Sequence, residues 1–448
     1  MRVLIQLRSS QRTRSALASR APAAGLAESL TPAAPGLIVD ATYEPVEIPA
    51  PQAPEPGANP FALNQPMEFS FARSAVTHVV RGEIADATVS ETISALMVSD
   101  PDVVGVFSDP VIESMVCPKQ PVGNHKDVAK RLDVSYLENR GMDGRNVKLA
   151  IVDSGINKAH LESLGRKPKL DTGKSWNPPK VTGKPGRHPV DHGTMCAFDA
   201  GIAAPKATLL DYALLLAPPS GPKVMSGYLS DGVLGYSKLL RLIRDTAPGR
   251  RRMVVSNSWG MFSPSWDFPP GHPGNYSDNP AHPFNVIVAS LERQGADILF
   301  AAGNCGRSPC IDGRCDFKRN QRAICGANSH PKVLSVGGID TKRRLIGYSS
   351  RGPGRLAADK PDISSYTEFA GSRVYPGSDG GTSAACPVAA GVVAAVRSKY
   401  SAAKVPPAKL RGLIRKTAAD LGQPGYDHDR GWGAINPRPL AEELAKVN

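Results

Sequence analysis

The larger part of the chain, from about residue 126, is constrained most by an alternation of apolar strand patterns and helical patterns. Short runs rich in Val, Ile and Leu predict strands near residues 147–152, 207–216, 254–256, 297–302 and 333–336. Segments with helical spacing predict helices near 228–245, 285–295, 383–400 and 407–419. Strands that alternate with helices favour a mainly parallel sheet with helices on both faces. We therefore predict an α/β fold for this part.

The first 118 residues show a different pattern, that of a small α+β unit. Strands are expected at 3–7, 78–84 and 103–107, with a helix from Thr88 between the last two. A stretch rich in Ala and Pro, at about 20–66, is expected to be a loop or flexible insertion. We expect a linker at 119–128 to separate this unit, residues 1–118, from the main domain at 129–448.

Charge is divided unevenly between these two parts. The chain has 54 Lys and Arg against 41 Asp and Glu, a net charge of +13. Residues 1–118 hold 7 basic and 13 acidic side chains, or −6, so the rest carries +19. The basic residues are scattered and no nucleic-acid motif is found, so we expect no nucleic-acid partner. An acidic unit that packs against a basic one is the simpler interpretation.

Apolar runs and cysteines bear on the location of the protein. No run of 18 apolar residues occurs, so no membrane span is expected. The apolar stretch near the start precedes its arginines, which is the reverse of a secretory signal, and a cytoplasmic location is expected. Four of the seven cysteines, Cys305, Cys310, Cys315 and Cys325, lie within 21 residues. A metal site, two disulfides and unpaired thiols are all open, and disulfides would conflict with a cytosolic location.

Three potential catalytic side chains follow a strand or begin a helix. Asp153 ends the apolar strand in IVDSGI, and His192 precedes a small-residue helix in DHGTMCAFDAGI. Ser383 stands between glycines and a helix in DGGTSAACPVAAG. Because active sites of open α/β sheets lie at the carboxyl ends of the strands, these side chains are expected to converge there.

The three residue types suit nucleophilic catalysis. A serine hydroxyl needs a base, histidine can take its proton near neutral pH, and a carboxylate can hold the imidazole in the right tautomer. A tetrahedral intermediate also needs donors for its oxyanion. The side-chain amide of Asn304, in ILFAAGNCG, and the backbone N–H of Ser383 could supply them.

Taken together, these segments resemble the motifs of subtilisin-like serine proteases, the subtilases. The motifs are Asp-Ser-Gly from Asp153, His-Gly-Thr at 192–194, Ala-Ala-Gly-Asn at 301–304 and Gly-Thr-Ser-Ala-Ala-Cys-Pro at 381–387. They stand in the family's order, and the resemblance covers roughly residues 130–440. It implies a subtilisin-like fold and a serine endopeptidase that needs no cofactor for its chemistry. In it, Asp153 orients, His192 is base and acid, Ser383 is the nucleophile and Asn304 stabilises the oxyanion.

The resemblance also implies how a protein or peptide substrate binds. Ser258, Trp259 and Gly260 would pair as a strand with the substrate backbone, and Ala302 and Gly303 would line the same site. Trp259 would form an apolar wall of a specificity pocket, although a plain packing role is the alternative.

The same resemblance implies that residues 1–118 are a propeptide, which acts as chaperone and intramolecular inhibitor. Cleavage would then fall within roughly 108–128. An unrelated accessory domain is the alternative.

Several departures from the family's pattern leave alternatives open. Cys196, one helical turn after His192, is either a small buried residue or a reactive thiol. The insertion at 261–284 is expected to be a Pro-rich surface loop beside the cleft rather than a metal site. A structural Ca²⁺ is compatible with the resemblance, but no acidic loop identifies its ligands. A peptide ligase or macrocyclase with the same acyl-enzyme, and an inactive subtilase-fold binding protein, are the competing functions.

Overall fold

In the computed structural model, seven parallel strands among the described residues form one sheet in the larger part of the chain, in the order β14-β13-β12-β11-β7-β9-β8. These strands are β7 (Lys148–Val152), β8 (Lys169–Leu170), β9 (Thr208–Tyr212), β11 (Met253–Asn257), β12 (Ala296–Ala301), β13 (Leu334–Ile339) and β14 (Ile363–Tyr366). The structure describes all residues except 31–35, 51–75, 118, 180, 217–224, 310–314, 316, 318–321 and 448.

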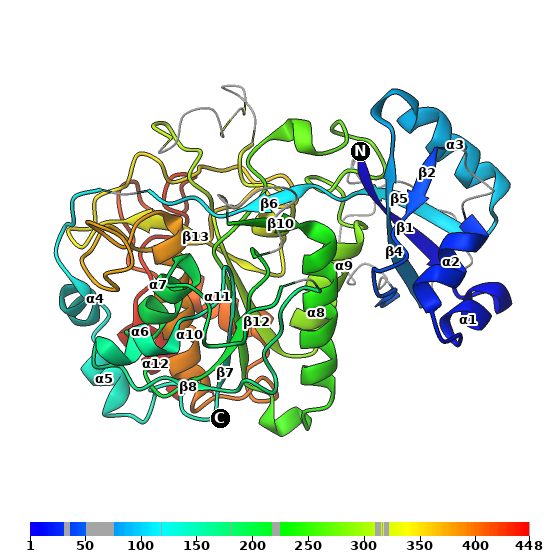
Figure 1. Cartoon of the computed structure of the whole chain (residues 1–448). Coiled ribbons are helices and arrows are strands. Elements are labelled where there is room, and N and C mark those ends of the chain that lie inside the picture. The colour runs from blue at the N-terminus through cyan, green and yellow to red at the C-terminus, as the bar shows by residue number, and fades with distance from the viewer. Residues whose placement is uncertain are drawn as a thin grey trace.

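Helices cover both faces of this sheet (Figure 1). Leu149 and Ile151 of β7 pack in the apolar cluster of α7 and α10, whereas Ala150 and Val152 pack in the cluster of α8 and α9. Burial on both faces explains why the strands appear as continuous apolar runs, and the predicted α/β fold is confirmed. The helices of this part are α4 (His125–Arg131), α5 (Val134–Glu138), α6 (Lys158–Ser163), α7 (His192–Ala200), α8 (Leu229–Arg244), α9 (Pro283–Arg293), α10 (Thr382–Arg397), α11 (Pro407–Thr417) and α12 (Pro437–Ala445).

The first part of the chain forms a separate antiparallel sheet, of five strands among the described residues, beside α8 and α9 (Figure 1). Val3, Ile5 and Leu7 of β1 pack with α2 and α3, while Leu4 joins the cluster of α8 and α9 on the opposite face. This sheet therefore packs on the larger part through its second face. Its elements are β1 (Arg2–Arg8), α1 (Gln11–Leu17), α2 (Pro22–Leu30), β2 (Leu37–Val39), β3 (Val46–Ile48), β4 (Thr77–Ile84), α3 (Val89–Ser99) and β5 (Val103–Ser108).

The loop predicted at about 20–66 is wrong for part of its length. This stretch contains α2, β2 and β3, and residues 31–35 and 51–66 lie outside the described residues. Ala and Leu are good helix formers, so their abundance in residues 22–30 supports a helix despite the nearby prolines. Leu37 and Val39, like Val46 and Ile48, alternate as buried residues and extend the sheet through β4.

Residues 109–128 contain more regular structure than a linker. β6 (Val111–Glu113) pairs antiparallel with β10 (Ser226–Tyr228) of the larger part, and Figure 1 shows it running from the small unit across that part. α4 begins at His125, inside the span expected as linker, because Asn124 and Asp127 form a capping box. Short 3-10 helices lie at Asp86–Thr88, Pro248–Arg250, Pro264–Trp266 and Gly326–Ser329. None of the described helices is long and apolar enough to cross a membrane.

The insertion at 261–284 is not the surface loop that its prolines suggested, because much of it is buried against the small unit. Phe268 packs in the core of that unit. Asp267 accepts a hydrogen bond from the hydroxyl of Ser108 at 2.6 Å, and Nε2 of His282 lies 2.9 Å from the carbonyl oxygen of Ser108. Asp267 and His282 are thus used in contacts between the two parts.

Candidate active site

The four side chains singled out in the sequence are carried to one edge of the parallel sheet. Asp153 directly follows β7, and Asn304 comes three residues after β12. β7 and β12 both neighbour β11, so their carboxyl ends lie at the same edge. His192 is the first residue of α7 and Ser383 the second residue of α10.

Asp153 and His192 form a buried hydrogen-bonded pair. Nδ1 of His192 lies 2.8 Å from Oδ1 of Asp153, which also accepts the backbone N–H of Ser154 at 2.7 Å. Burial opposes protonation of the imidazole, but Asp153 outweighs it, so the pKa of His192 is raised above its ordinary value. Because the carboxylate can only accept, Nδ1 carries a proton. Nε2 is buried and has no hydrogen-bond partner among the described residues.

Two glycines allow the Asp153 turn to lie against the helix of His192. A Cβ atom on Gly193 would lie 2.5 Å from the carbonyl oxygen of Gly155, so only glycine fits this close approach. Gly155 has a φ of +91°, which side chains with a Cβ rarely adopt. The N–H of Gly193 donates to the hydroxyl of Ser154 at 3.0 Å. Glycine at these two positions therefore allows the turn after Asp153 to pack closely against α7.

Ser383 is positioned by a glycine before it and a proline after it. Gly381 has a φ of +76° and turns the chain into α10. Pro387 has no N–H, so the carbonyl oxygen of Ser383 lacks its usual helical donor. The hydroxyl of Ser258 donates to this oxygen at 3.0 Å, and Sγ of Cys196 lies 3.5 Å away. Through these two contacts the carbonyl oxygen of Ser383 connects α10 with α7, which carries Cys196, and with the segment after β11, which carries Ser258.

The hydroxyl of Ser383 has a long contact, 3.5 Å, with the carbonyl oxygen of Ser258. Sγ of Cys196 lies between the two helices, because it is 3.7 Å from Nδ1 of His192 and 3.5 Å from the carbonyl oxygen of Ser383. Burial raises the pKa of the Cys196 thiol well above its ordinary value, so this cysteine is a protonated, buried neighbour of the pair. Nε2 of His192 has no partner among the described residues, so Ser383 and His192 are not hydrogen-bonded in this structure, and attack assisted by His192 requires the two side chains to approach each other.

Asn304 and the start of α10 place two donors around one point. The side-chain oxygen of Asn304 accepts the N–H and the hydroxyl of Thr382, at 2.9 and 3.0 Å, which fixes the orientation of the amide. A Cβ atom on Gly381 would lie 3.1 Å from Nδ2 of Asn304 and 3.4 Å from the backbone nitrogen of Ser383. The amide of Asn304 thus lies close to the start of α10, where an oxyanion formed by attack of Ser383 would need donors.

Residues 111–115 lie along this site as an added strand, which the sequence had not revealed. Glu113 exchanges two backbone hydrogen bonds with Gly260, at 2.9 and 3.0 Å. The N–H of Ser114 donates to the carbonyl oxygen of Met225 at 3.1 Å, and the hydroxyl of Ser114 donates to the carbonyl oxygen of Ser258 at 3.0 Å. Main-chain pairing on both sides is the way an extended peptide binds by strand addition.

The carbonyl oxygen of Met115 lies near the start of α10. It is 3.5 Å from the Cβ position of Gly381 that has Nδ2 of Asn304 and the nitrogen of Ser383 at 3.1 and 3.4 Å. The added strand therefore brings the peptide bond after Met115 close to the helix that carries Ser383. The only sequence signal for it was the window predicted for cleavage, 108–128.

The residues predicted to bind substrate occupy different surroundings. Ser258 and Gly260 contact the 111–115 strand through their main chains, as described above. Ala302 donates its N–H to Val336 at 2.9 Å, and Gly303 donates its own to the hydroxyl of Thr382 at 3.1 Å. These two residues thus connect the end of β12 with its neighbours and support the position of Asn304.

Trp259 packs in the core rather than in the pocket of Met115. Its side chain is 1% exposed, with ring centroids 5.8 Å from Phe284 and 5.2 Å from Phe300. Met115 belongs to a different apolar cluster. The cluster of Trp259 also contains Ile112 of the added strand, so a pocket wall for that residue fits as well as plain packing, and the role of Trp259 stays a prediction.

The cysteines near Asn304 include one defined disulfide. Cys305 is bonded to Cys315, whereas Cys325 is a free thiol buried in another cluster. Cys310 lies outside the described residues, and Cys117 is also disulfide-bonded. Disulfides persist mainly in oxidising compartments, so this disulfide conflicts with the expected cytoplasmic location, which stays a prediction.

Among the described residues, the group of side chains that could hold a metal ion is part of the candidate active site. Asp153, His192 and Cys196 have ligand atoms within 4.8 Å of one another. Ca²⁺ prefers six to eight oxygen ligands, so this set of an imidazole, a thiol and one carboxylate does not fit it.

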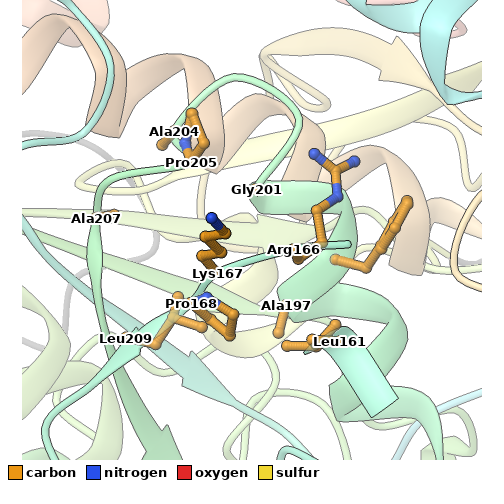
Figure 2. A pocket seen from close by; sticks show the side chains of 11 residues that line it. Leu161, Arg166, Lys167, Pro168, Ala197, Gly201, Ala204, Pro205, Ala207 and Leu209 are labelled. Atoms are coloured by element: carbon orange, nitrogen blue, oxygen red, sulfur yellow. The ribbon is translucent and has the colours of Figure 1, made fainter. Parts of the chain in front are cut away.

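A small cavity lies elsewhere on α7, away from the added strand. Its volume is about 40 Å³, and Figure 2 shows Ala197, Gly201, Arg166 and Leu161 around it. None of the four candidate catalytic residues lines it. It has room for a water molecule or two but not for a peptide.

Comparison with known proteins identifies the family. A family profile described as "Subtilase family" matches residues 144–433. The chain is similar to Subtilisin E of Bacillus subtilis, with 24% identity over 362 residues that cover 80% of each protein. Subtilisin DY of Bacillus licheniformis is 27% identical over 312 residues, which cover 68% of this chain and 94% of that protein. The Calcium-dependent protease of Trichormus variabilis is 27% identical over 338 residues, which cover 67% of this chain and 46% of that protein.

The matched region spans more than half of the chain. It contains the parallel sheet and the four residues that meet at its carboxyl edge. The chain therefore belongs to the subtilase family of serine peptidases.

Proposed function

We propose that this peptidase is an endopeptidase made as a proenzyme, which cuts its own chain between Met115 and Val116. The observation that carries the proposal is the main-chain pairing of Glu113 with Gly260 and of Ser114 with Met225, which brings the next residue, Met115, to the start of α10. A strand that enters from residues 111–113 presents this bond in the way that a substrate would be presented.

In the proposed reaction, Oγ of Ser383 attacks the carbonyl carbon of Met115. Nε2 of His192 takes the serine proton and then delivers it to the leaving nitrogen of Val116. Asp153 holds the imidazole with Nδ1 protonated and stabilises the imidazolium. Asn304 and the N–H of Ser383 stabilise the oxyanion. Water then hydrolyses the ester, and the same groups serve any extended peptide that replaces residues 111–115.

The small N-terminal unit is, in this proposal, an inhibitor bound within the same chain. Arg81 of β4 reaches Asp231 of α8 at 3.3 Å, and the hydroxyl of Tyr43 donates to the carbonyl oxygen of Ser230 at 2.8 Å. Lys238 of α8 pairs with Glu44 at 2.9 Å. The small unit contributes the cation, Arg81, to one of these ion pairs and the anion, Glu44, to the other. Specific contacts rather than net charge therefore hold the unit over α8 and bring residues 111–115 to the site.

Intact-mass spectrometry of the purified wild-type protein tests the proposal. We expect fragments of residues 1–115 and 116–448, and the larger fragment should take one fluorophosphonate, a probe that labels nucleophilic serines. Heat-denatured protein, in which the site is lost, serves as the control and should take none. A full-length chain that takes no probe after prolonged incubation would contradict both the nucleophile and the self-processing.

Replacement of Asn304 by alanine is expected to lower kcat by about 10²–10³-fold, the size measured in subtilisin itself for loss of such an amide. KM for a peptide substrate should change little, because the amide acts mainly on the charge that develops in the transition state. Steady-state kinetics with a chromogenic peptide measures both constants. A rise in KM with an unchanged kcat would assign Asn304 to ground-state binding instead.

A further inference from the structure

Two carboxyl groups meet in the interior, between the helix of His192 and the turn before Ser383. Asp199 lies on α7, seven positions after His192, and is fully buried. Asp379 stands four positions before Ser383 and is also buried. Neither carboxyl takes part in the proposed reaction. The two segments that carry the proposed base and nucleophile are thus also joined by an acidic pair.

Asp379 is the member of the pair with several hydrogen-bond donors. Its Oδ2 accepts the backbone N–H of Ser372 at 2.7 Å, and its Oδ1 accepts the hydroxyl of Ser372. Its own N–H donates to the carbonyl oxygen of Phe369 at 2.9 Å, and its carbonyl oxygen accepts the N–H of Glu368 at 2.8 Å. Burial raises the pKa of Asp379, whereas Ser372 and Asp199 oppose this shift by donating to the carboxylate. Asp379 is therefore the ionised partner.

Asp199 lacks such donors. Neither of its carboxyl oxygens receives a hydrogen bond from a backbone N–H, a hydroxyl or a cation among the described residues. A buried carboxylate without donors is costly, so such a group takes up a proton instead. A protonated Asp199 can donate to Asp379. Burial, the charge of Asp379 and this hydrogen bond raise the pKa of Asp199 well above its ordinary value, so the pair holds one proton.

The surroundings offer little positive charge that could hold both groups ionised. The cation whose charge acts on Asp199 is Arg166, from the segment after α6. Its guanidinium lies 4.3 Å from the ring centroid of Phe198, and its Nη2 has no hydrogen-bond partner among the described residues. The other titratable or charged groups on the elements packed here are His125 of α4, His160 of α6, Cys196 of α7, Cys386 of α10, and Glu368 and Arg373 of the loop around Ser372.

The turn that begins at Asp379 leads directly to Ser383. A Cβ atom on Gly371 would collide with Oδ2 of Asp379 and would lie 3.0 Å from Cε1 of Phe198, the residue before Asp199. The carboxylate of Asp379 thus packs closely beside α7. Because close-packed interiors transmit a displacement, repulsion between two ionised carboxylates would move the turn and with it Ser383.

We propose that Asp199 is a positioning residue, which shares one proton with Asp379 and so holds the turn before Ser383 against the helix of His192. Loss of the shared proton would set the alkaline limit of activity. The inference rests on the proposed function, since it takes Ser383 as nucleophile and His192 as base. It adds a residue outside the reacting groups on which their alignment depends.

The pH dependence has a definite sign. The link is complete while the pair keeps its proton, and it is lost as the pH rises through the raised pKa of Asp199. His192 must be neutral to act as base, so activity is also lost on the acidic side. A plot of kcat/KM against pH should therefore be bell-shaped, with an alkaline limb that reports the titration of the coupled carboxyl pair.

Asp199→Asn tests the link, because its amide can still donate to Asp379 but cannot ionise. We expect this variant to lose the alkaline limb of kcat/KM, measured on a chromogenic peptide that copies residues 111–115, over the pH range in which each self-processed protein stays folded. Glu292→Gln is the matched control, since it removes another buried carboxyl, on α9, and should keep the wild-type limb. An alkaline limb at the wild-type pH in Asp199→Asn would overturn the inference, as would a wild type without one.

Asp199→Leu removes the donor but keeps the space filled. We expect kcat to fall by about 10- to 100-fold with little change in KM, the size that a displacement of about 1 Å can cost, and we expect Asp199→Asn to recover most of this loss. A Leu variant with wild-type kcat would show that the link does not position Ser383. If the Leu variant does not fold, the pH profile of Asp199→Asn decides.

Fluorophosphonate labelling of the wild type near neutral pH separates this inference from the proposed function. A wild type that takes no probe and cuts no peptide would contradict the proposed function and the inference together. A wild type that takes the probe, with an alkaline limb that Asp199→Asn leaves in place, would overturn the inference alone.

Discussion

Replacement of Ser383 by alanine is expected to leave the purified chain at its full length of 448 residues and unable to take a fluorophosphonate probe. Among the described residues, the thiol of Cys196 is a poor alternative nucleophile, since it is buried and its pKa is raised well above its ordinary value. Turnover of peptide substrates should fall by about 10⁶-fold, the loss known for the nucleophile of subtilisin. Intact mass, probe labelling and peptide kinetics measure the three effects.

Ser378→Ala is the matched control for this variant. Ser378 lies five residues before Ser383, is buried, and its hydroxyl has no hydrogen-bond partner among the described residues. The same atom can therefore be removed from the same segment without loss of a contact, and processing and labelling should persist. If Ser383→Ala is still cut at Met115–Val116 when expressed without any other active protease, the cleavage is not carried out by this serine.

The fold of the larger part could be predicted because its signals are local. Strands such as β7 and β12 are buried on both faces and appear in the sequence as apolar runs, whereas the edge strands β8 and β14 contain polar residues and were not predicted. Asp153 stands directly after one such run, and Gly193 and Gly381 mark the close approaches that position His192 and Ser383. The sequence alone was therefore enough to predict that the four candidate residues lie at one edge of the sheet.

The substrate-like strand could not be predicted, because its partners are distant in the sequence. β6 has only three residues, and it pairs with β10 and with Gly260 more than a hundred positions away. No local pattern records such a pairing. The same limit explains Trp259, whose packing against Phe284 and Phe300 depends on the positions of α9 and β12.

Cysteine pairing and the N-terminal insertion were open for different reasons. The spacing of four nearby cysteines permits several pairings, and only the folded chain brings Cys305 to Cys315. In the stretch at 20–66, frequent Ala and Pro concealed a helix and two strands of three residues, β2 and β3, which gain their stability from pairing with β4. Short elements of this kind depend on tertiary context more than on propensity.

Replacement of Asp153 by asparagine is expected to lower kcat/KM by about 10⁴-fold, the size known for the equivalent change in a serine protease of another fold. The substitution keeps the shape of the side chain but allows its amide to donate to Nδ1 of His192. The imidazole would then carry its proton on Nε2, where it cannot take one from Ser383. Asp211→Asn, on the neighbouring strand β9, is the matched control and should cost far less, because Asp211 makes no contact with His192 that the structure describes.

The pH dependence of the Asp153→Asn variant separates an electrostatic role from a purely structural one. The base must be neutral to act, so activity is lost as the pH falls through the pKa of His192. Burial lowers this pKa, and Asp153 raises it above the ordinary histidine value. Removal of the carboxylate charge leaves burial opposed only by Asp191, so the acidic limb of kcat/KM should move to lower pH while the plateau falls. A limb that stays at the wild-type pH would mean that Asp153 only supports the local structure, and that the loss of activity comes from a displaced imidazole.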